Sequence, residues 1–197
     1  MSIFYLVRHG TTQYNLENRF QGHLDIPLSN QGIEQAKKLA DYLKDKKIDA
    51  IYTSDLKRAV QTAEYIAAAK SMKYRLLPSL REVDVGELEG LRWHEVKKEY
   101  PDWVKKQHVH GYPGGETRIE IERRVSNLWD SVVKRHKGDG VVLVTHGGII
   151  KALICQILGI SQEDRSNFII DNASVSTIIV ADSGAKLKML NNTVFLE

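Results

Sequence analysis

The chain has 197 residues, of which 42% are hydrophobic and 27% are charged, and its formal net charge is +3. This length and composition predict a single domain over residues 1–197 with a sizeable core. Acidic and basic residues are interspersed, which argues against a nucleic-acid partner and leaves any preference for anionic ligands to a local site.

The sequence also indicates where the protein works. No stretch approaches the roughly 18 apolar residues of a membrane span, so we expect no membrane partner. The N-terminal apolar run meets Arg8 too early for a signal peptide. The one cysteine, Cys155, cannot form an internal disulfide, which is typical of a reducing compartment. We therefore expect a cytoplasmic protein.

The first half of the chain alternates apolar runs with helical patterns. Strands are predicted at residues 4–7, 49–54 and 74–80. Ser29 and Ser54 are each placed to cap a following helix. In the second of these helices, Arg58 lies off the stripe of apolar positions.

The second half begins with an irregular stretch, residues 81–115, rich in glycine and aromatic residues. We expect it to lie over one end of the sheet, with residues 91–113 setting substrate specificity. His94, His108 and His110 of this segment have no role that the sequence assigns. A helix is predicted at 116–136, a strand at 141–144, a helix at 149–159, and final strands at 174–182 and 186–195.

This alternation predicts an α/β fold with a sheet covered by helices. The last strand is apolar enough to be a sheet edge that pairs between subunits, which leaves a homo-oligomer open.

Two strands far apart in the sequence each end on a histidine. The first leads into Arg8, His9 and Gly10, and the strand at 141–144 leads into Thr145, His146 and Gly147. Because ligands bind beyond the carboxyl ends of strands in open α/β sheets, we expect these tips to share one site. Arginine presents a fork of donors that suits phosphate, and Arg58 is a second such fork.

Each of these residues also has a plainer interpretation. A single arginine at a strand end is usually a surface ion-pair partner, and a single histidine is usually structural. Two histidines are also possible metal ligands, yet the chain has no HExxH, no cysteine cluster and no glycine-rich nucleotide motif. We therefore expect no metal and no cofactor, and the joint arrangement favours a phosphate site.

Beyond these tips, the chain carries longer motifs. LVRHGTTQYNLENRFQGHLDIPLSNQGIEQA resembles the opening of the histidine phosphatase superfamily, also called phosphoglycerate mutase-like. The match continues, in the family's order and over most of the chain, through YTSDLKRAVQTAEYIA, LREVDVGELEG, YPGGET and VVLVTHGGII. The resemblance implies a three-layer α/β/α sandwich with a mostly parallel central sheet and a phosphate pocket at the strand tips.

The resemblance also implies roles by position. His9 matches the phosphorylated nucleophile, and Glu82 matches the general acid, although Glu87 and Glu89 are its rivals from the residues alone. The phosphate clamp matches Arg8, Arg58 and His146. Further positions expected to bind substrate are Asn15, Gln21, Gly22, Gly147, Trp93 and Tyr112.

The implied reaction is metal-independent hydrolysis of a small phosphorylated metabolite through a phosphohistidine. The arginines and a protonated His146 are expected to hold His9 neutral, ready for attack on phosphorus. Two alternatives stay open: a cofactor-dependent phosphoglycerate mutase and a non-catalytic phosphoryl-ligand binding domain. The phosphatase branch is favoured because the family's mutases resemble one another in a longer insertion and a covering tail, whereas this chain ends almost at its last predicted strand, on NNTVFLE.

Overall fold

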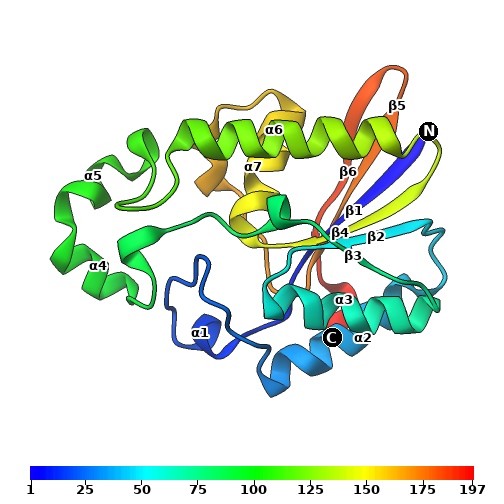
Figure 1. The fold of residues 1–197 in the computed structure, drawn as a ribbon, viewed down its shortest axis with the longest axis horizontal. Coiled ribbons are helices and arrows are strands. Elements are labelled where there is room, and N and C mark those ends of the chain that lie inside the picture. The colour runs from blue at the N-terminus through cyan, green and yellow to red at the C-terminus, as the bar shows by residue number, and fades with distance from the viewer.

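A six-stranded sheet forms the centre of the computed structural model, which describes residues 1–197 apart from the side chains of residues 106–110 (Figure 1). His108 and His110 therefore lie outside the described residues. The strands are β1 (Ser2–Arg8), β2 (Ala50–Thr53), β3 (Arg75–Leu76), β4 (Gly140–Thr145), β5 (Val175–Ala181) and β6 (Gly184–Asn192). Their order is β3-β2-β4-β1-β5-β6, and only β5 runs against its neighbours. The mostly parallel sheet is confirmed.

Helices cover both faces of this sheet. On one face lie α2 (Asn30–Lys44) and α3 (Lys57–Lys70), and on the other α6 (Arg118–Arg135) and α7 (Gly147–Leu158). Successive side chains of a strand point to opposite faces, so Phe4 and Leu6 pack with α6 and α7 while Tyr5 and Val7 pack with α2 and α3. This explains why β1 is a continuous apolar run, and it confirms the three-layer α/β/α sandwich.

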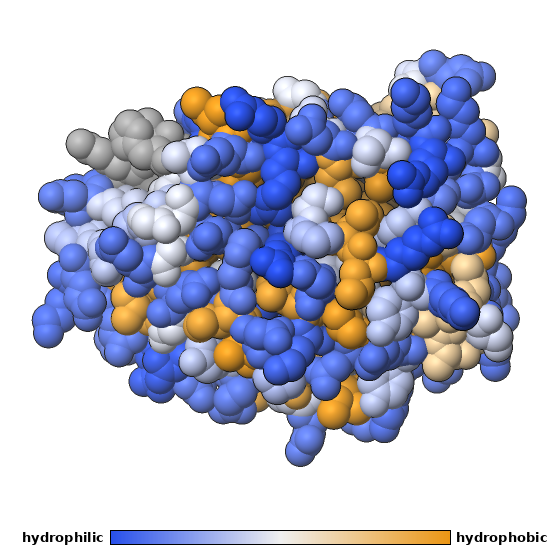
Figure 2. Space-filling model, in the orientation of Figure 1, coloured by the Kyte–Doolittle hydropathy of each residue, from blue (hydrophilic) through white to orange (hydrophobic). Residues whose placement is uncertain are grey.

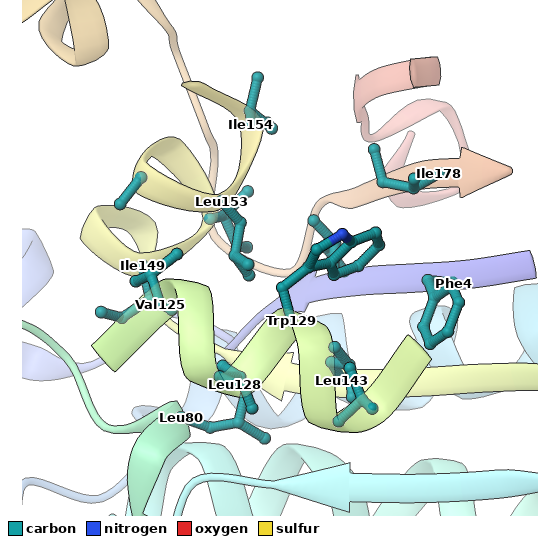
Figure 3. Packing of buried hydrophobic residues seen from close by; sticks show 14 of the residues in the cluster. Phe4, Leu80, Val125, Leu128, Trp129, Leu143, Ile149, Leu153, Ile154 and Ile178 are labelled. Carbon is teal, nitrogen blue, oxygen red and sulfur yellow. The ribbon is translucent and has the colours of Figure 1, made fainter. Parts of the chain in front are cut away.

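The core beneath α6 is closely packed around one aromatic pair. The rings of Phe4 and Trp129 lie 5.0 Å apart, centre to centre, at an angle of 57°. Leu153 of α7 and Ile178 of β5 lie in the same cluster (Figure 3). This packing fixes α7, whose first turn follows the His146 tip.

The stretch over the sheet's end is less irregular than expected. It contains α4 (Trp93–Glu99) and α5 (Pro101–His110), and a third short helix, α1 (Gln13–Leu16), lies on the same side of the molecule, past the ends of the parallel strands (Figure 1). Val85, Leu88 and Val96 form a small separate core there. Single-turn 3₁₀ helices are found at Pro78–Leu80, Gly86–Leu88 and Val194–Leu196, and a longer one at Gln162–Asn167.

One predicted strand boundary and one predicted helix cap were wrong. The strand predicted at 74–80 is only Arg75–Leu76, because Pro78 starts a 3₁₀ turn. Ser54 does not cap α3: its hydroxyl accepts the Leu56 N–H at 3.3 Å, and Leu56 is itself the N-cap. Ser29 does cap α2, as predicted, by accepting the Gly32 N–H.

The surface is mostly hydrophilic on one face (Figure 2), and the edge strand of the sheet carries exposed lysines. On the face shown in Figure 2, hydrophilic residues dominate and apolar residues form only small separate groups. The last strand is a sheet edge, as predicted, and it exposes Lys186 and Lys188. Lysines on an edge disfavour strand pairing, and pairing between subunits stays a prediction. Within the described residues, no helix has the length and apolar character to cross a membrane.

A buried hydrogen-bond chain holds the opposite end of the sheet. The Asp139 carboxylate accepts a hydrogen bond from Nδ1 of His136 at 2.9 Å, so Nε2 is the unprotonated nitrogen. Nε2 accepts the Tyr52 hydroxyl proton, also at 2.9 Å. A helix end and a strand are thereby tied together.

Tyr52→Phe is expected to lower the free energy of unfolding by about 1–3 kcal/mol, because it leaves the buried Nε2 of His136 without a partner. Urea unfolding with an unchanged slope against denaturant measures this. Tyr74→Phe is the matched control, since its hydroxyl makes only an exposed bond to Glu64. Equal midpoints for Tyr52→Phe and the unaltered chain would contradict the prediction.

Candidate active site

The two histidine tips meet because β1 and β4 are parallel neighbours. Arg8 stands opposite Thr145 in their register, so His9 and His146 follow side by side. The His9 N–H donates to the Thr145 carbonyl at 3.0 Å, and the two imidazole rings lie 5.1 Å apart. Both side chains are buried.

His9 is held in one tautomer. Its Nδ1 lies 2.7 Å from the Gly10 carbonyl, and since a carbonyl only accepts, Nδ1 carries the proton. Nε2 therefore keeps its lone pair. Burial, then Arg58 and Arg8, hold the pKa of His9 well below its usual 6.5, so the ring is neutral at physiological pH, as expected.

His146 differs from its expectation. Arg58 donates its Nε–H to Nδ1 of His146 at 3.2 Å, so that nitrogen is unprotonated and the proton sits on Nε2. Burial, then Arg58 and His9, lower its pKa well below 6.5. The predicted protonated His146 is therefore wrong: the ring is a neutral donor whose buried Nε2 has no partner among the described residues.

Arg58 is the most deeply buried charge of the site. The prediction that it lies off the buried face of its helix was wrong, because its side chain is fully enclosed. It donates to the carbonyls of Leu24 at 2.7 Å and Gly22 at 2.8 Å. Burial lowers its pKa to about 10, against the opposing effect of Glu82, so it remains a cation at neutral pH.

Arg8 lies beside the first turn of α7. It donates from Nη1 to the Ile170 carbonyl at 2.6 Å, while its buried Nε has no partner among the described residues. Burial lowers its pKa. A Cβ on Gly147 would touch Arg8 Nε at 3.4 Å, which places this glycine against the guanidinium.

Glu82 faces the same helix start. Its Oε1 accepts the Val83 N–H at 2.9 Å and its Oε2 accepts the Gly148 N–H at 3.3 Å. A Cβ on Gly148 would lie 2.5 Å from Oε1, so only glycine lets the carboxylate approach. The rivals Glu87 and Glu89 do not line the cavities described next, where Glu82 is the one carboxylate among the described residues.

Two adjoining cavities open at this point. The inner cavity, about 220 Å³, is bordered by Arg8, His9, Arg58 and Glu82 together with Asn15, Gln21 and Gly22. The outer cavity, about 310 Å³, is bordered by Trp103, Lys151 and Arg165 with Gly147. Tyr112 and Glu82 border both, whereas His146 borders neither.

The amides of the inner cavity are oriented by one threonine. The Thr12 hydroxyl lies 3.0 Å from Oδ1 of Asn15 and 2.9 Å from Oε1 of Gln21, so its single proton is shared between these two acceptors. With their oxygens so engaged, the amide N–H groups are the donors left to a ligand. Gly22 has a positive φ of 47°, and a Cβ there would run into Glu89 and Val85.

The family model of the histidine phosphatase superfamily (branch 1) matches residues 4–193. The chain belongs to this superfamily. Among the relatives, phosphoserine phosphatase 1 of Hydrogenobacter thermophilus is 36% identical, over 97% of this chain and 92% of that one. A metal-independent phosphoserine phosphatase of Arabidopsis thaliana is 33% identical, over 98% and 84%. Other matching relatives are named probable phosphoglycerate mutases.

The solved structures agree with this membership. A phosphoserine phosphatase mutant from Entamoeba histolytica, crystallised with phosphoserine, is 28% identical and superposes with a TM-score of 0.90 over the whole of both chains. The present histidine phosphatase is thus an enzyme, a phosphoric monoester hydrolase that uses a histidine nucleophile and acts without metal. The non-catalytic alternative is excluded.

Some residues around the cavities of this histidine phosphatase differ from those that the sequence predicted. Trp93 borders neither cavity and packs on Phe20, 5.9 Å between ring centres, so Trp103 is the tryptophan that joins Tyr112. Lys151 and Arg165 were not predicted at all, since the polar segment around Arg165 reads as surface. His94 is exposed. In the described part of the chain, no three metal-ligating side chains gather at one point.

The two buried histidines predict how stability depends on pH. Their pKa values lie well below 6.5 in the folded chain and return to about 6.5 on unfolding. Below pH 6.5 the unfolded chain therefore binds protons that the folded one does not, and the free energy of unfolding falls as pH falls. Each histidine is expected to lower the free energy of unfolding by on the order of 1 kcal/mol per pH unit well below pH 6.5, and to have little effect above it.

Urea unfolding between pH 5 and 7 measures this dependence. His9→Asn should remove one of the two contributions, whereas His94→Asn, at an exposed position, should leave the dependence unchanged. The same slope in the unaltered chain and in His9→Asn would contradict the assignment.

Proposed function

We propose that this histidine phosphatase hydrolyses a small phosphorylated metabolite of the phosphoserine type through a phosphohistidine at His9. One observation carries the proposal: the hydrogen bond to Gly10 leaves the His9 Nε2 lone pair free beside a cavity lined by three arginines, Arg8, Arg19 and Arg58. A phosphate dianion repels nucleophiles, so attack on it needs a neutral nucleophile within a cationic site.

The inner cavity supplies the binding groups. Arg8 and Arg58 balance the charge of the phosphoryl oxygens, and the amides of Asn15 and Gln21 add neutral hydrogen bonds. The unpartnered Nε2–H of His146, whose ring centre lies 5.1 Å from that of His9, is a further donor. The backbone carbonyls of Leu24 and Gly22 keep the Arg58 fork in place.

The chemistry follows in two steps. Nε2 of His9 attacks phosphorus while the ester P–O bond breaks, and protonated Glu82 gives its proton to the leaving alkoxide. Water then attacks the phosphorus, Glu82 takes the water proton, and the P–N bond breaks to release phosphate and restore His9. The two arginines stabilise the charge spread over the equatorial oxygens in both steps.

The named relatives support the substrate type. Two of them are phosphoserine phosphatases that span nearly all of this chain, and the inner cavity of about 220 Å³ is of a size for a small phosphomonoester. The proposal treats residues 1–197 as one domain, and assigns residues 91–113 to specificity because Trp103 and Tyr112 border the outer cavity. The cytosol is its compartment, since the single, buried Cys155 suits reducing conditions.

Phosphate release in the presence of EDTA tests the proposal. The panel holds p-nitrophenyl phosphate, phosphoserine, α-ribazole phosphate and 3-phosphoglycerate, and phosphoserine is expected to rank high. Conversion of 3- to 2-phosphoglycerate is followed in parallel with the bisphosphoglycerate primer. Efficient conversion with little phosphate release would overturn the proposal in favour of the mutase.

A further inference from the structure

The outer cavity holds two cations that the reaction at His9 does not use. Lys151 lies one helical turn beyond Gly147 on α7 and is only half-buried. Arg165 belongs to the 3₁₀ helix Gln162–Asn167, and its guanidinium lies over the Tyr112 ring at 6.0 Å. Nη1 of Arg165 is buried and has no partner among the described residues.

Neither cation is neutralised by the protein. The ion pairs between described residues include neither Lys151 nor Arg165, although neighbouring Glu163 is paired with Arg118. Among the described residues, Glu82 is the one carboxylate that borders their cavity. Burial lowers the pKa of Lys151, and the positive charges of Arg8 and Arg165 act in the same direction. An anion placed here would relieve this mutual repulsion.

The outer cavity and the inner cavity share several of their lining residues. Arg8, Glu82, Tyr112 and Gly148 line both, so a substrate with its phosphate beside His9 has room to extend into the outer cavity. The Tyr112 and Trp103 rings close one side, which limits the group's size.

We propose that Lys151 and Arg165 form a carboxylate subsite that selects phosphomonoesters carrying a carboxylate close to the phosphate. The subsite rests on the proposed function. That function places the phosphate beside His9 in the inner cavity, and the remainder of the substrate then extends towards the outer cavity. A carboxylate matches the planar fork of Arg165, and its negative charge offsets part of the positive charge of Lys151 and Arg165.

A matched pair of substrates tests the subsite. 3-Phosphoglycerate and glycerol 3-phosphate differ only by a carboxylate in place of a hydroxymethyl group. The unaltered enzyme is expected to favour 3-phosphoglycerate in kcat/KM by about ten- to a hundredfold, the range of one to two charge-assisted contacts. In the Lys151→Gln/Arg165→Gln double variant this ratio should fall towards one, mainly through KM. The Lys186→Gln/Lys188→Gln variant removes two charges from the exposed edge strand and should keep the ratio.

Calorimetric binding to the His9→Ala variant separates the subsite from the chemistry. A preference for 3-phosphoglycerate that disappears with Lys151→Gln/Arg165→Gln supports the subsite, even if the unaltered enzyme hydrolyses neither of these compounds nor phosphoserine, in which case the proposed function fails. Hydrolysis of both compounds at equal kcat/KM refutes the subsite and leaves the proposed function standing. Glycerol 1,3-bisphosphate is the third arm: a gain larger than that of the carboxylate would overturn the assignment to a carboxylate.

Discussion

Replacement of His9 by alanine is expected to lower phosphomonoester turnover by on the order of 10⁴-fold or more and to abolish the phosphoenzyme. No other described imidazole near the pocket is equipped to take its place. Nδ1 of His146 is occupied by Arg58, and His23 borders neither cavity. The measurement is steady-state kinetics together with trapping of a labelled phosphoenzyme that is stable to base and labile to acid.

The control for His9→Ala is His94→Ala, which changes an exposed histidine of the same chain and should leave turnover within about twofold. Phosphate affinity should survive in His9→Ala, because Arg8 and Arg58 remain. A His9→Ala enzyme that still turns over and still carries acid-labile phosphate would assign the nucleophile to another residue.

Glu82→Gln is expected to lower turnover of phosphoserine by about 10²- to 10⁴-fold, because the alkoxide then leaves without a proton. The glutamine oxygen still accepts one of the two backbone N–H groups that Glu82 binds, so the fold of the loop should persist. With p-nitrophenyl phosphate the outcome differs, since nitrophenolate needs no proton to leave. Phosphorylation of His9 should stay fast while hydrolysis of the phosphohistidine slows, so rapid-quench experiments should show a burst and an accumulated phosphoenzyme.

Glu87→Gln and Glu89→Gln are the comparisons for this prediction. Glu87 is outside the cavities, and its substitution should change turnover by only a few fold. Glu89 accepts the backbone N–H of His23 at 2.5 Å. Its substitution should therefore disturb the loop around His23 and raise KM, without changing how the rate depends on the leaving group. If the Glu87→Gln or the Glu89→Gln variant showed the burst, the general acid would be the residue changed in that variant and not Glu82.

The site at the strand tips is predictable from sequence because a local pattern, an apolar run followed directly by polar residues, marks each tip. A continuous apolar run indicates a strand buried on both faces, and polar residues directly after two such runs must meet if the strands are parallel neighbours. The structure has both features in β1 and β4. The longer motifs add Glu82, Asn15 and Gln21, which no periodicity would have placed.

The remainder depends on contacts that no local pattern encodes. Arg58 sits off an apolar stripe, yet carbonyls from a distant loop allow it to be buried as a cation. The neutral state of His146 follows from one hydrogen bond across the fold. Arg165 reaches the outer cavity only because the chain after α7 turns back over Tyr112.

The pairing of the first strand has a consequence for how the chain is made. Ser2–Arg8 bonds to residues 140–145 on one side and to residues 175–181 on the other. A ribosome that adds about 5–20 residues per second needs roughly ten to forty seconds to deliver both partners. Until β4 is made, this apolar strand has no neighbour in the sheet, and until β5 is made it has only one. The site at His9 therefore forms late in synthesis, because it needs the strand that leads into His146.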